Sequence, residues 1–230
     1  MRWLVLVVVG ALWLALGALA LNLVTVPPAW NPWAPLSIDD PPNALTRTKL
    51  ARLSADAAAC RATLAGSALR FTPLPDRRTG EGCGFDDAVR IEATPARVDP
   101  AFALSCRSAV ALALWERHVV QPAALASFGQ PVARLTHFGS YACRNVYGRP
   151  DARRSQHATA DALDVSGFVL ADGTSIRVAT DWKGDGPRAR FLHEVHDGAC
   201  RFFDGVLGPD ANAAHHDHLH VDRGAFRVCR

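Results

Sequence analysis

A cluster of histidines near the C-terminus limits the possible folds more than any other part of the sequence. Four of the nine histidines lie in the segment His215-His216-Asp217-His218-Leu219-His220. In a β-strand, residues i and i+2 face the same side, so His218 and His220 can both reach one point while Leu219 turns into the core. Two imidazoles on one face of a strand make half of a metal site, although a solvated surface run has the same pattern. The cluster therefore needs a partner elsewhere in the chain.

The partner is the segment from Ser155 to Asp164, in which His157 is followed seven residues later by Asp164 at the start of an expected strand. The small residues between them let the backbone fold closely. Together with His220 they supply two imidazoles and one carboxylate. Zinc takes these donors, and a site with three protein ligands keeps its fourth position for water. The sequence therefore predicts a catalytic zinc ion bound by His157, Asp164 and His220.

The first 26 residues are almost entirely apolar and carry a single charge, at Arg2, before three prolines follow at short intervals. A bilayer crossing takes about 20 apolar residues. We expect residues 1–26 to remain as a membrane anchor, although Ala18-Leu19-Ala20 also resembles the cleavage site of a signal peptide. In either case the rest of the chain is exported, either as a periplasmic domain anchored in the inner membrane or as a protein secreted into the periplasm.

The remaining chain is expected to hold a Pro/Trp-rich extended linker over 27–42 and one domain over 43–230. A hydrophobic content of 49% and a charged content of 20% are ordinary for a globular protein. The formal charge of +3 is small, and no basic stripe alternates with aromatic residues. We therefore expect no nucleic-acid partner.

Six cysteines follow the apolar segment, and an even number of this kind is typical of disulfides formed in an oxidising compartment. None of their spacings matches a structural zinc site. Several pairings are open to six cysteines. Our expected set joins Cys60 to Cys83, Cys106 to Cys143, and Cys200 to Cys229.

The spacing of apolar residues predicts an α+β domain with a small, mainly antiparallel sheet flanked by helices. One helix is expected from Leu45 to Leu64, between a possible N-cap at Asn43 and a stop at Gly66. A second should begin at Asp99-Pro100. A loop is expected over 73–84, further helices over 122–128 and 188–200, and strands over 89–93, 132–138, 163–170, 175–179 and 219–221.

These motifs carry a family resemblance. The S-x-H-x6-D segment followed by H-x-H resembles the LAS group of zinc peptidases, which includes D-alanyl-D-alanine peptidases, lysostaphin-like endopeptidases and the hedgehog signalling domain. Within the group the chain is most similar to bacterial extensin-like C-terminal domain proteins, from about residue 43 to the C-terminus. The resemblance implies a fold like that of hedgehog and the D-Ala-D-Ala carboxypeptidases. Its pattern is visible in residues 139–145, 155–164, 181–182, 191–192, 198–200, 206–209 and 215–222.

The resemblance also implies roles for individual residues. His157, Asp164 and His220 match the family's metal ligands, and His218 matches the histidine beside the bound water. His215 stands where relatives place the general base or the residue that orients it. Zinc lowers the pKa of its water to about 7, close to the ordinary pKa of histidine, so either residue could accept the proton. The choice of base between His215 and His218 stays open.

Three further residues are assigned to the substrate. In relatives an arginine near Arg144 binds a substrate carboxylate or carbonyl, as a forked guanidinium can, although an ordinary surface arginine is the alternative. Tyr141 belongs to the same segment. Ser155 could orient substrate, but a hydrogen bond that fixes His157 is the favoured role. Polar neighbours with supporting or merely solvated roles are Asp161, Asp217 and Asp222.

The predicted function is that of an exported zinc metallopeptidase that hydrolyses peptide bonds of peptidoglycan with a zinc-activated water. It could be a D,D- or L,D-carboxypeptidase or endopeptidase. Its partners would be peptidoglycan peptides and, through the N-terminal segment, the membrane. The alternative is a catalytically silent, zinc-containing module that binds the cell wall or a protein, as the hedgehog domain shows is possible. A structural extensin role has no support, because proline-rich repeats are absent from the sequence.

Overall fold

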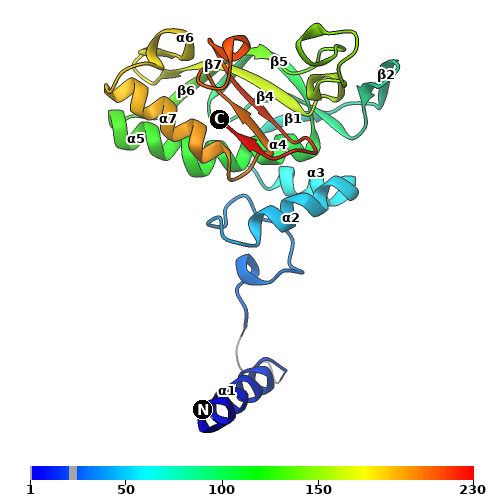
Figure 1. The fold of residues 1–230 in the computed structure, drawn as a ribbon, viewed down its shortest axis with the longest axis vertical. Coiled ribbons are helices and arrows are strands. Elements are labelled where there is room, and N and C mark those ends of the chain that lie inside the picture. Colours follow the sequence, from blue (N-terminus) through cyan, green and yellow to red (C-terminus); the bar gives the residue numbers. More distant parts are fainter. Residues whose placement is uncertain (1, 21–24) are drawn as a thin grey trace.

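The computed structural model describes residues 2–20 and 25–230 of the 230-residue chain (Figure 1). Helix α1 (Arg2–Ala20) forms over the apolar N-terminal segment and extends for 19 residues. No helix among the described residues combines the length and the apolar character that a membrane crossing takes. The transmembrane anchor predicted over 1–26 is therefore not found in them, and residues 1 and 21–24 of that prediction lie outside the described parts.

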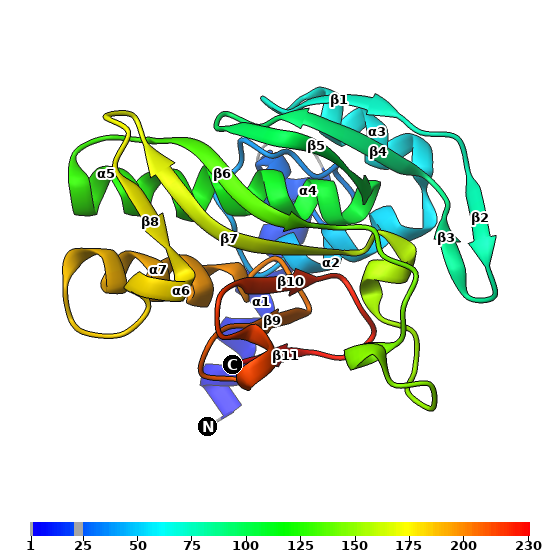
Figure 2. The same ribbon diagram turned by 90° about the horizontal axis from the view of Figure 1, so that it is seen from above.

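A mainly antiparallel sheet, nine-stranded in the described chain, forms the centre of the domain (Figure 2). Its strand order is β1-β4-β5-β6-β7-β10-β9-β11, with β8 paired to β7. The pairs β5–β6 and β9–β11 are parallel. This confirms the α+β class, with a larger sheet than expected. The strands are β1 (Arg70–Pro73), β4 (Ala88–Ala93), β5 (Arg97–Ser105), β6 (Val132–Gly139), β7 (Ala162–Leu170), β8 (Ser175–Arg177), β9 (Gly205–Leu207), β10 (Leu219–Asp222) and β11 (Val228–Cys229).

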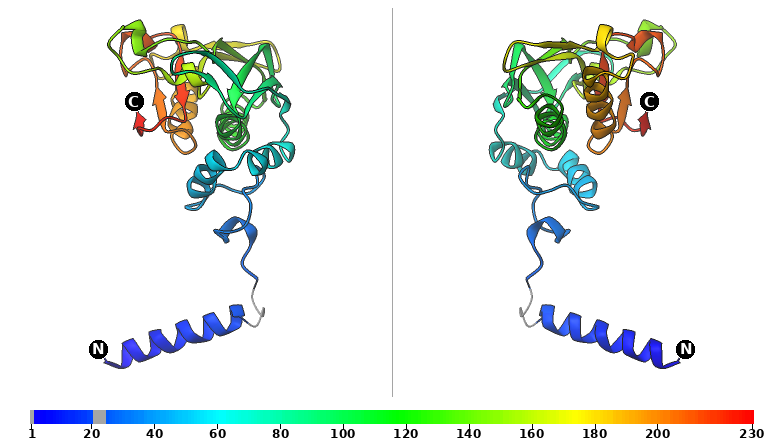
Figure 3. Two further views of the ribbon diagram at one scale, coloured as in Figure 1. Left: turned by 90° about the vertical axis from the view of Figure 1, so that its right-hand side faces the viewer. Right: turned by 90° about the vertical axis from the view of Figure 1, so that its left-hand side faces the viewer.

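Helices cover one face of this sheet. Figures 2 and 3 show α4 (Cys106–Trp115) and α5 (Gln121–Phe128) in line beneath it, with α7 (Pro187–Ala199) alongside α5. The helices α2 (Thr46–Arg52) and α3 (Ala57–Ala65) pack against α4 from below (Figure 1). The shorter helical segments of the described chain are η1 (Pro28–Trp30), η2 (Leu53–Ala55), η3 (Glu116–Val120), η4 (Val146–Gly148), η5 (Gln156–Thr159), α6 (Val178–Asp181) and η6 (Ala213–His215).

Alternation along two central strands separates the core from the opposite face of the sheet. Leu163 and Val165 of β7 and Leu219 and Val221 of β10 are all at most 1% exposed and belong to the main core cluster. Because successive strand residues point to opposite faces, the residues between them, including Asp164, point away from the helices. The sheet thus offers polar side chains on the face that the helices do not cover.

The prediction that a helix starts at Asp99-Pro100 is wrong, because the helix begins several residues later. These residues lie in β5, which pairs antiparallel with β4 up to the partners Ala88 and Ser105. The helix begins only at Cys106, where the Ser105 side chain accepts a hydrogen bond from the Ser108 N–H. Pairing with β4 therefore prevailed over the local helix signal.

The helix expected from Leu45 to Leu64 is also divided. Asp56 adopts an extended backbone conformation and caps α3 by accepting from the Ala59 N–H, which separates α3 from α2 and η2. The predicted stop at Gly66 is confirmed as the C-cap of α3. The expected loop over 73–84 instead contains a hairpin of β2 (Arg77–Gly80) and β3 (Cys83–Phe85).

The predicted linker packs against the domain. Leu36 and Ile38 are buried in the main core cluster. The buried Lys49 amine donates to the Pro28 carbonyl over 2.7 Å, and the Asn43 amide donates to the Ala29 carbonyl over 2.9 Å. These contacts hold 28–43 along α2, so this part of the chain is not a free spacer.

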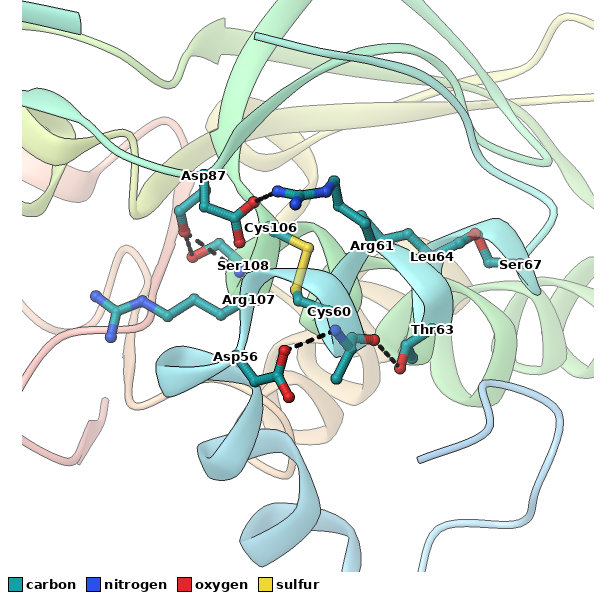
Figure 4. Close-up of a disulfide and its surroundings, with 12 residues drawn as sticks. Asp56, Cys60, Arg61, Thr63, Leu64, Ser67, Asp87, Cys106, Arg107 and Ser108 are labelled. Carbon is teal, nitrogen blue, oxygen red and sulfur yellow. Dashed lines mark hydrogen bonds and ion pairs between the residues drawn. A yellow bond between two sulfur atoms is a disulfide. The ribbon is translucent and has the colours of Figure 1, made fainter. Parts of the chain in front are cut away.

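All six cysteines form disulfides, but two of the three expected pairs are wrong. The bond between Cys200 and Cys229 is confirmed. The others join Cys60 to Cys106 and Cys83 to Cys143, with Cα–Cα distances of 6.1 and 5.5 Å. Figure 4 shows the first of these bonds between α3 and the start of α4. Cysteines pair by spatial proximity, and here helix packing brings together residues that are 46 positions apart.

Candidate metal centre

The three predicted ligands meet on the uncovered face of the sheet. His157 comes from the short helix η5 (Gln156–Thr159), Asp164 from β7 and His220 from β10. The His157 Nε2 lies 3.1 Å from Asp164 Oδ1 and 3.2 Å from His220 Nδ1. The His220 Nδ1 lies 2.9 Å from Asp164 Oδ1. Three potential donor atoms thus form a nearly equilateral triangle.

Strand register and a short turn produce this arrangement. His220 and Asp164 are direct partners in the antiparallel β7–β10 pair, so their side chains leave the sheet next to each other on the same face. The turn before β7 carries His157 back over them. Ser155 caps this turn by accepting from the His157 N–H, and Ala160 ends it with a φ of 55°. The structural role favoured for Ser155 therefore matches the geometry.

The triangle fits a metal ion. Donors bound tetrahedrally at 2.0–2.2 Å lie about 3.3–3.6 Å apart. The observed separations of 2.9–3.2 Å need to widen by only a few tenths of an ångström to reach these values. Two nitrogens and one carboxylate oxygen form a donor set that suits first-row transition metals and zinc. His157, Asp164 and His220 could therefore hold one ion.

Both histidines are oriented by acceptors for their outer nitrogens. The His157 Nδ1–H donates to the Ser140 carbonyl over 2.5 Å, and the His220 Nε2–H donates to Asp222 Oδ2 over 3.0 Å. These bonds leave His157 Nε2 and His220 Nδ1 as the inward lone pairs, which is the usual arrangement around a metal. The supporting role suggested for Asp222 agrees with this geometry. The sequence offered no signal for Ser140, because it acts through its backbone carbonyl.

Charges around the triangle strongly perturb two groups. Burial raises the pKa of Asp164, but hydrogen bonds from His157 and His220 and their charges hold that pKa far below its usual value. Burial lowers the pKa of His220, yet hydrogen bonds and charges from Asp164 and Asp222 outweigh it and raise the pKa to about 9. Near pH 7 a proton therefore occupies the triangle, and any metal ion that binds there would have to displace it.

Two more histidines lie against the triangle. The His218 Nδ1–H donates to Asp217 over 2.8 Å, and its Nε2 lies 3.5 Å from Asp164 Oδ1. The His215 Nδ1–H donates to the Asn212 side chain over 2.9 Å. Burial, together with the nearby charges of His220 and His218, lowers the pKa of His215 to about 4. In these tautomers the Nε2 of each histidine carries the lone pair, and the Nε2 of His218 lies toward the Asp164 carboxylate.

These residues line a pocket of about 180 Å³ that also contains Arg144 and Ser155. Tyr141, the other residue assigned to the substrate, is not among its lining residues. Its ring packs edge-to-face on Phe85 at 5.3 Å, and its hydroxyl is hydrogen-bonded to Thr79 of β2. The structure therefore places Tyr141 in a packing role, away from the metal triangle.

A family model described as Extensin-like protein C-terminus matches residues 58–230. The chain belongs to this family. No curated protein and no solved structure matches the chain. The matched region of this extensin-like domain contains the whole sheet, the metal triangle and the pocket around it.

Sequence reasoning missed several residues of the extensin-like site. Asn212 holds His215 and also caps the short helix η6 (Ala213–His215), so a capping pattern was its available signal. Arg153, Tyr147 and Phe226 line the pocket as well. Tyr147 and Phe226 are 55% and 68% exposed, which is high for aromatic side chains, but their proximity to the metal ligands depends on the fold.

A second group of possible metal donors in the extensin-like domain has a different explanation. Cys60, Cys106 and Asp87 have donor atoms within 4.8 Å of one another. The two sulfurs are bonded to each other, and Asp87 forms an ion pair with Arg61 (Figure 4). A disulfide supplies no thiolate, so this group is a structural crosslink.

Proposed function

We propose that the protein is an exported zinc metallopeptidase of the LAS type that hydrolyses peptide bonds of peptidoglycan. The observation that carries this proposal is the donor triangle of His157, Asp164 and His220, whose sides of 2.9–3.2 Å lie within a few tenths of an ångström of the donor spacing around a tetrahedral zinc ion. Zinc is the ion that combines this donor set with an open fourth position in hydrolases. The fixed outer nitrogens support a resident metal.

The residues around the triangle supply the proton chemistry. When bound, zinc polarises the scissile carbonyl and lowers the pKa of a water to about 7. We assign His218 as the general base, because Asp217 fixes its tautomer and stabilises the imidazolium that forms. His218 then passes the proton to the leaving amine. His215, with a pKa near 4, stays neutral at pH 7 and acts as a positioning residue in the pocket wall.

Substrate and location are supported by separate observations. The exposed Arg144 in the pocket wall can bind a carbonyl or carboxylate of the peptide through its guanidinium. The three disulfides support export to an oxidising compartment such as the periplasm. Peptidoglycan as the substrate depends on the resemblance to LAS peptidases.

The test is hydrolysis of purified peptidoglycan by the full chain, with released peptides identified by mass spectrometry and bound zinc measured in parallel. His218→Ala should keep zinc and lose at least about a hundredfold in rate. His216→Ala is the matched control, because that side chain is 71% exposed and does not line the pocket. Full zinc occupancy without any peptide product from any wall type would favour the silent binding module instead.

A further inference from the structure

The loop between Arg144 and Ser155 is ordered by its own hydrogen bonds. The Val146 N–H donates to the Arg153 carbonyl over 2.9 Å, and the Ser155 N–H donates to the Arg144 carbonyl over 3.0 Å. The disulfide from Cys143 to Cys83 ties the start of the loop to β3. The backbone of Arg153 is therefore fixed although its side chain is exposed.

The Arg153 side chain is held at the pocket by an aromatic ring. Its guanidinium carbon lies 5.6 Å from the centre of the Phe226 ring, and both residues line the same pocket as the metal triangle. Stacking of this kind restrains the plane of the guanidinium and leaves its N–H groups free at the edge. Phe226 is itself 68% exposed, so the pair forms an accessible wall.

The Arg153 guanidinium forms no direct ion pair in the described part of the protein, although its charge helps to lower the pKa of Asp222 in the same pocket. Within that part, no carboxylate lies within 4.0 Å of the Arg153 guanidinium, whereas Arg149 of the same loop pairs with Asp151. The neighbouring Arg154 donates to the Asn145 side chain over 2.8 Å. Asp222 accepts hydrogen bonds from His220 and from the Gly224 N–H. The N–H groups of the restrained Arg153 guanidinium can therefore pair with an anion of a ligand.

We propose that Arg153 and Phe226 form a carboxylate subsite of the pocket, which selects peptides with a free carboxylate next to the scissile bond. Cleavage of the bound peptide rests on the proposed function, whereas binding of the peptide at this subsite does not. The carboxylate could be the C-terminal α-carboxylate or a side-chain carboxylate such as that of diaminopimelate. A guanidinium binds either group through the same paired N–H bonds.

The experiment measures peptide affinity by calorimetry with the full chain loaded with zinc. One probe pair is a stem pentapeptide with a free C-terminus and its C-terminal amide. In the second pair both peptides end in a C-terminal amide. The third residue is diaminopimelate in one of them and lysine in the other. We expect one carboxylate probe to bind about tenfold to a hundredfold more tightly than its partner. Arg153→Gln should remove that preference, and Arg149→Gln should keep it.

The outcomes separate this subsite from the peptidase activity. A preference that survives in Arg153→Gln, for example because the carboxylate binds zinc directly, overturns the subsite, and so does a wild-type protein without any preference. Hydrolysis of both members of each pair at equal kcat/KM also overturns it, while supporting the peptidase. A preference that depends on Arg153 without any hydrolysis supports the subsite and contradicts the peptidase. Unchanged zinc content and Tm in Arg153→Gln show that the variant is folded.

Discussion

Replacing Asp161 with alanine should loosen the turn that carries the metal ligands. From the sequence, a supporting role and a solvated surface position were equally plausible for Asp161. Its side chain is buried, with 6% exposure. It accepts hydrogen bonds from Ser105 over 2.5 Å, from Thr159 over 2.8 Å and from Arg107 over 2.8 Å, with a second Arg107 contact of 2.8 Å. These bonds fix the turn between His157 and Asp164 to the start of α4.

The size of the effect follows from this environment. Breaking a fully buried ion pair costs about 3–5 kcal/mol. The Arg107 side chain is 32% exposed and can be hydrated once Asp161 is removed, so the lower end applies, about 3 kcal/mol. For a domain of this size, each kcal/mol shifts Tm by about 2–4 °C, which predicts a decrease of about 6–12 °C.

The assay is thermal unfolding of zinc-loaded and chelated protein, together with zinc affinity. Asp161→Ala should lower Tm in both states and weaken zinc binding, since a looser turn places His157 less precisely. Asp185→Ala is the control, because Asp185 is an exposed carboxylate distant from the turn in sequence. A shift of about 2 °C corresponds to about 0.5–1 kcal/mol. A Tm for Asp161→Ala within about 2 °C of the wild type, with unchanged zinc affinity, would show that these bonds do not hold the turn.

Four further predictions concern the site. The pKa of metal-free His220 is raised from 6.5 to about 9, so zinc must displace a proton from this residue below pH 9. Zinc affinity, measured by competition titration, should therefore rise about tenfold per pH unit between pH 7 and 9. A constant affinity over this range would contradict the prediction. By the same linkage, chelated protein should lose stability as the pH rises from 6.5 through 9, which is measured as a falling midpoint of urea unfolding. Asp222→Asn should weaken zinc binding about 10–100-fold in equilibrium dialysis, and an unchanged affinity would remove Asp222 from the support of His220. Replacing Cys83 and Cys143 with serine should raise the KM for peptides while zinc stays bound, and loss of zinc would show that this disulfide supports the triangle instead.

The metal triangle could be predicted because its determinants are local. Leu163 and Val165 alternate with Asp164, and Leu219 and Val221 alternate with His220, so the apolar residues alone assign the two ligands to the face opposite the core. The seven-residue spacing from His157 accommodates one turn before the strand. Each of these patterns extends over fewer than about ten residues, within the range in which sequence periodicity is informative.

Other features depend on contacts between distant segments. Cys60 pairs with Cys106 because α3 packs on α4, a contact that cysteine spacing does not encode. Asp99-Pro100 reads as a helix start, but strand pairing places it in β5. Tyr141 turns toward Phe85 instead of the pocket. In each case tertiary packing chose between local alternatives that the sequence left nearly equal.

The central claim, that the triangle holds a catalytic zinc ion, is tested most directly by adding zinc back to chelated protein and following release of peptides from purified peptidoglycan. We expect no release without metal, a rate that reaches its maximum at one zinc per chain, and no recovery in His157→Ala. Release that is indifferent to chelation, or that recovers equally in His157→Ala, would contradict this claim.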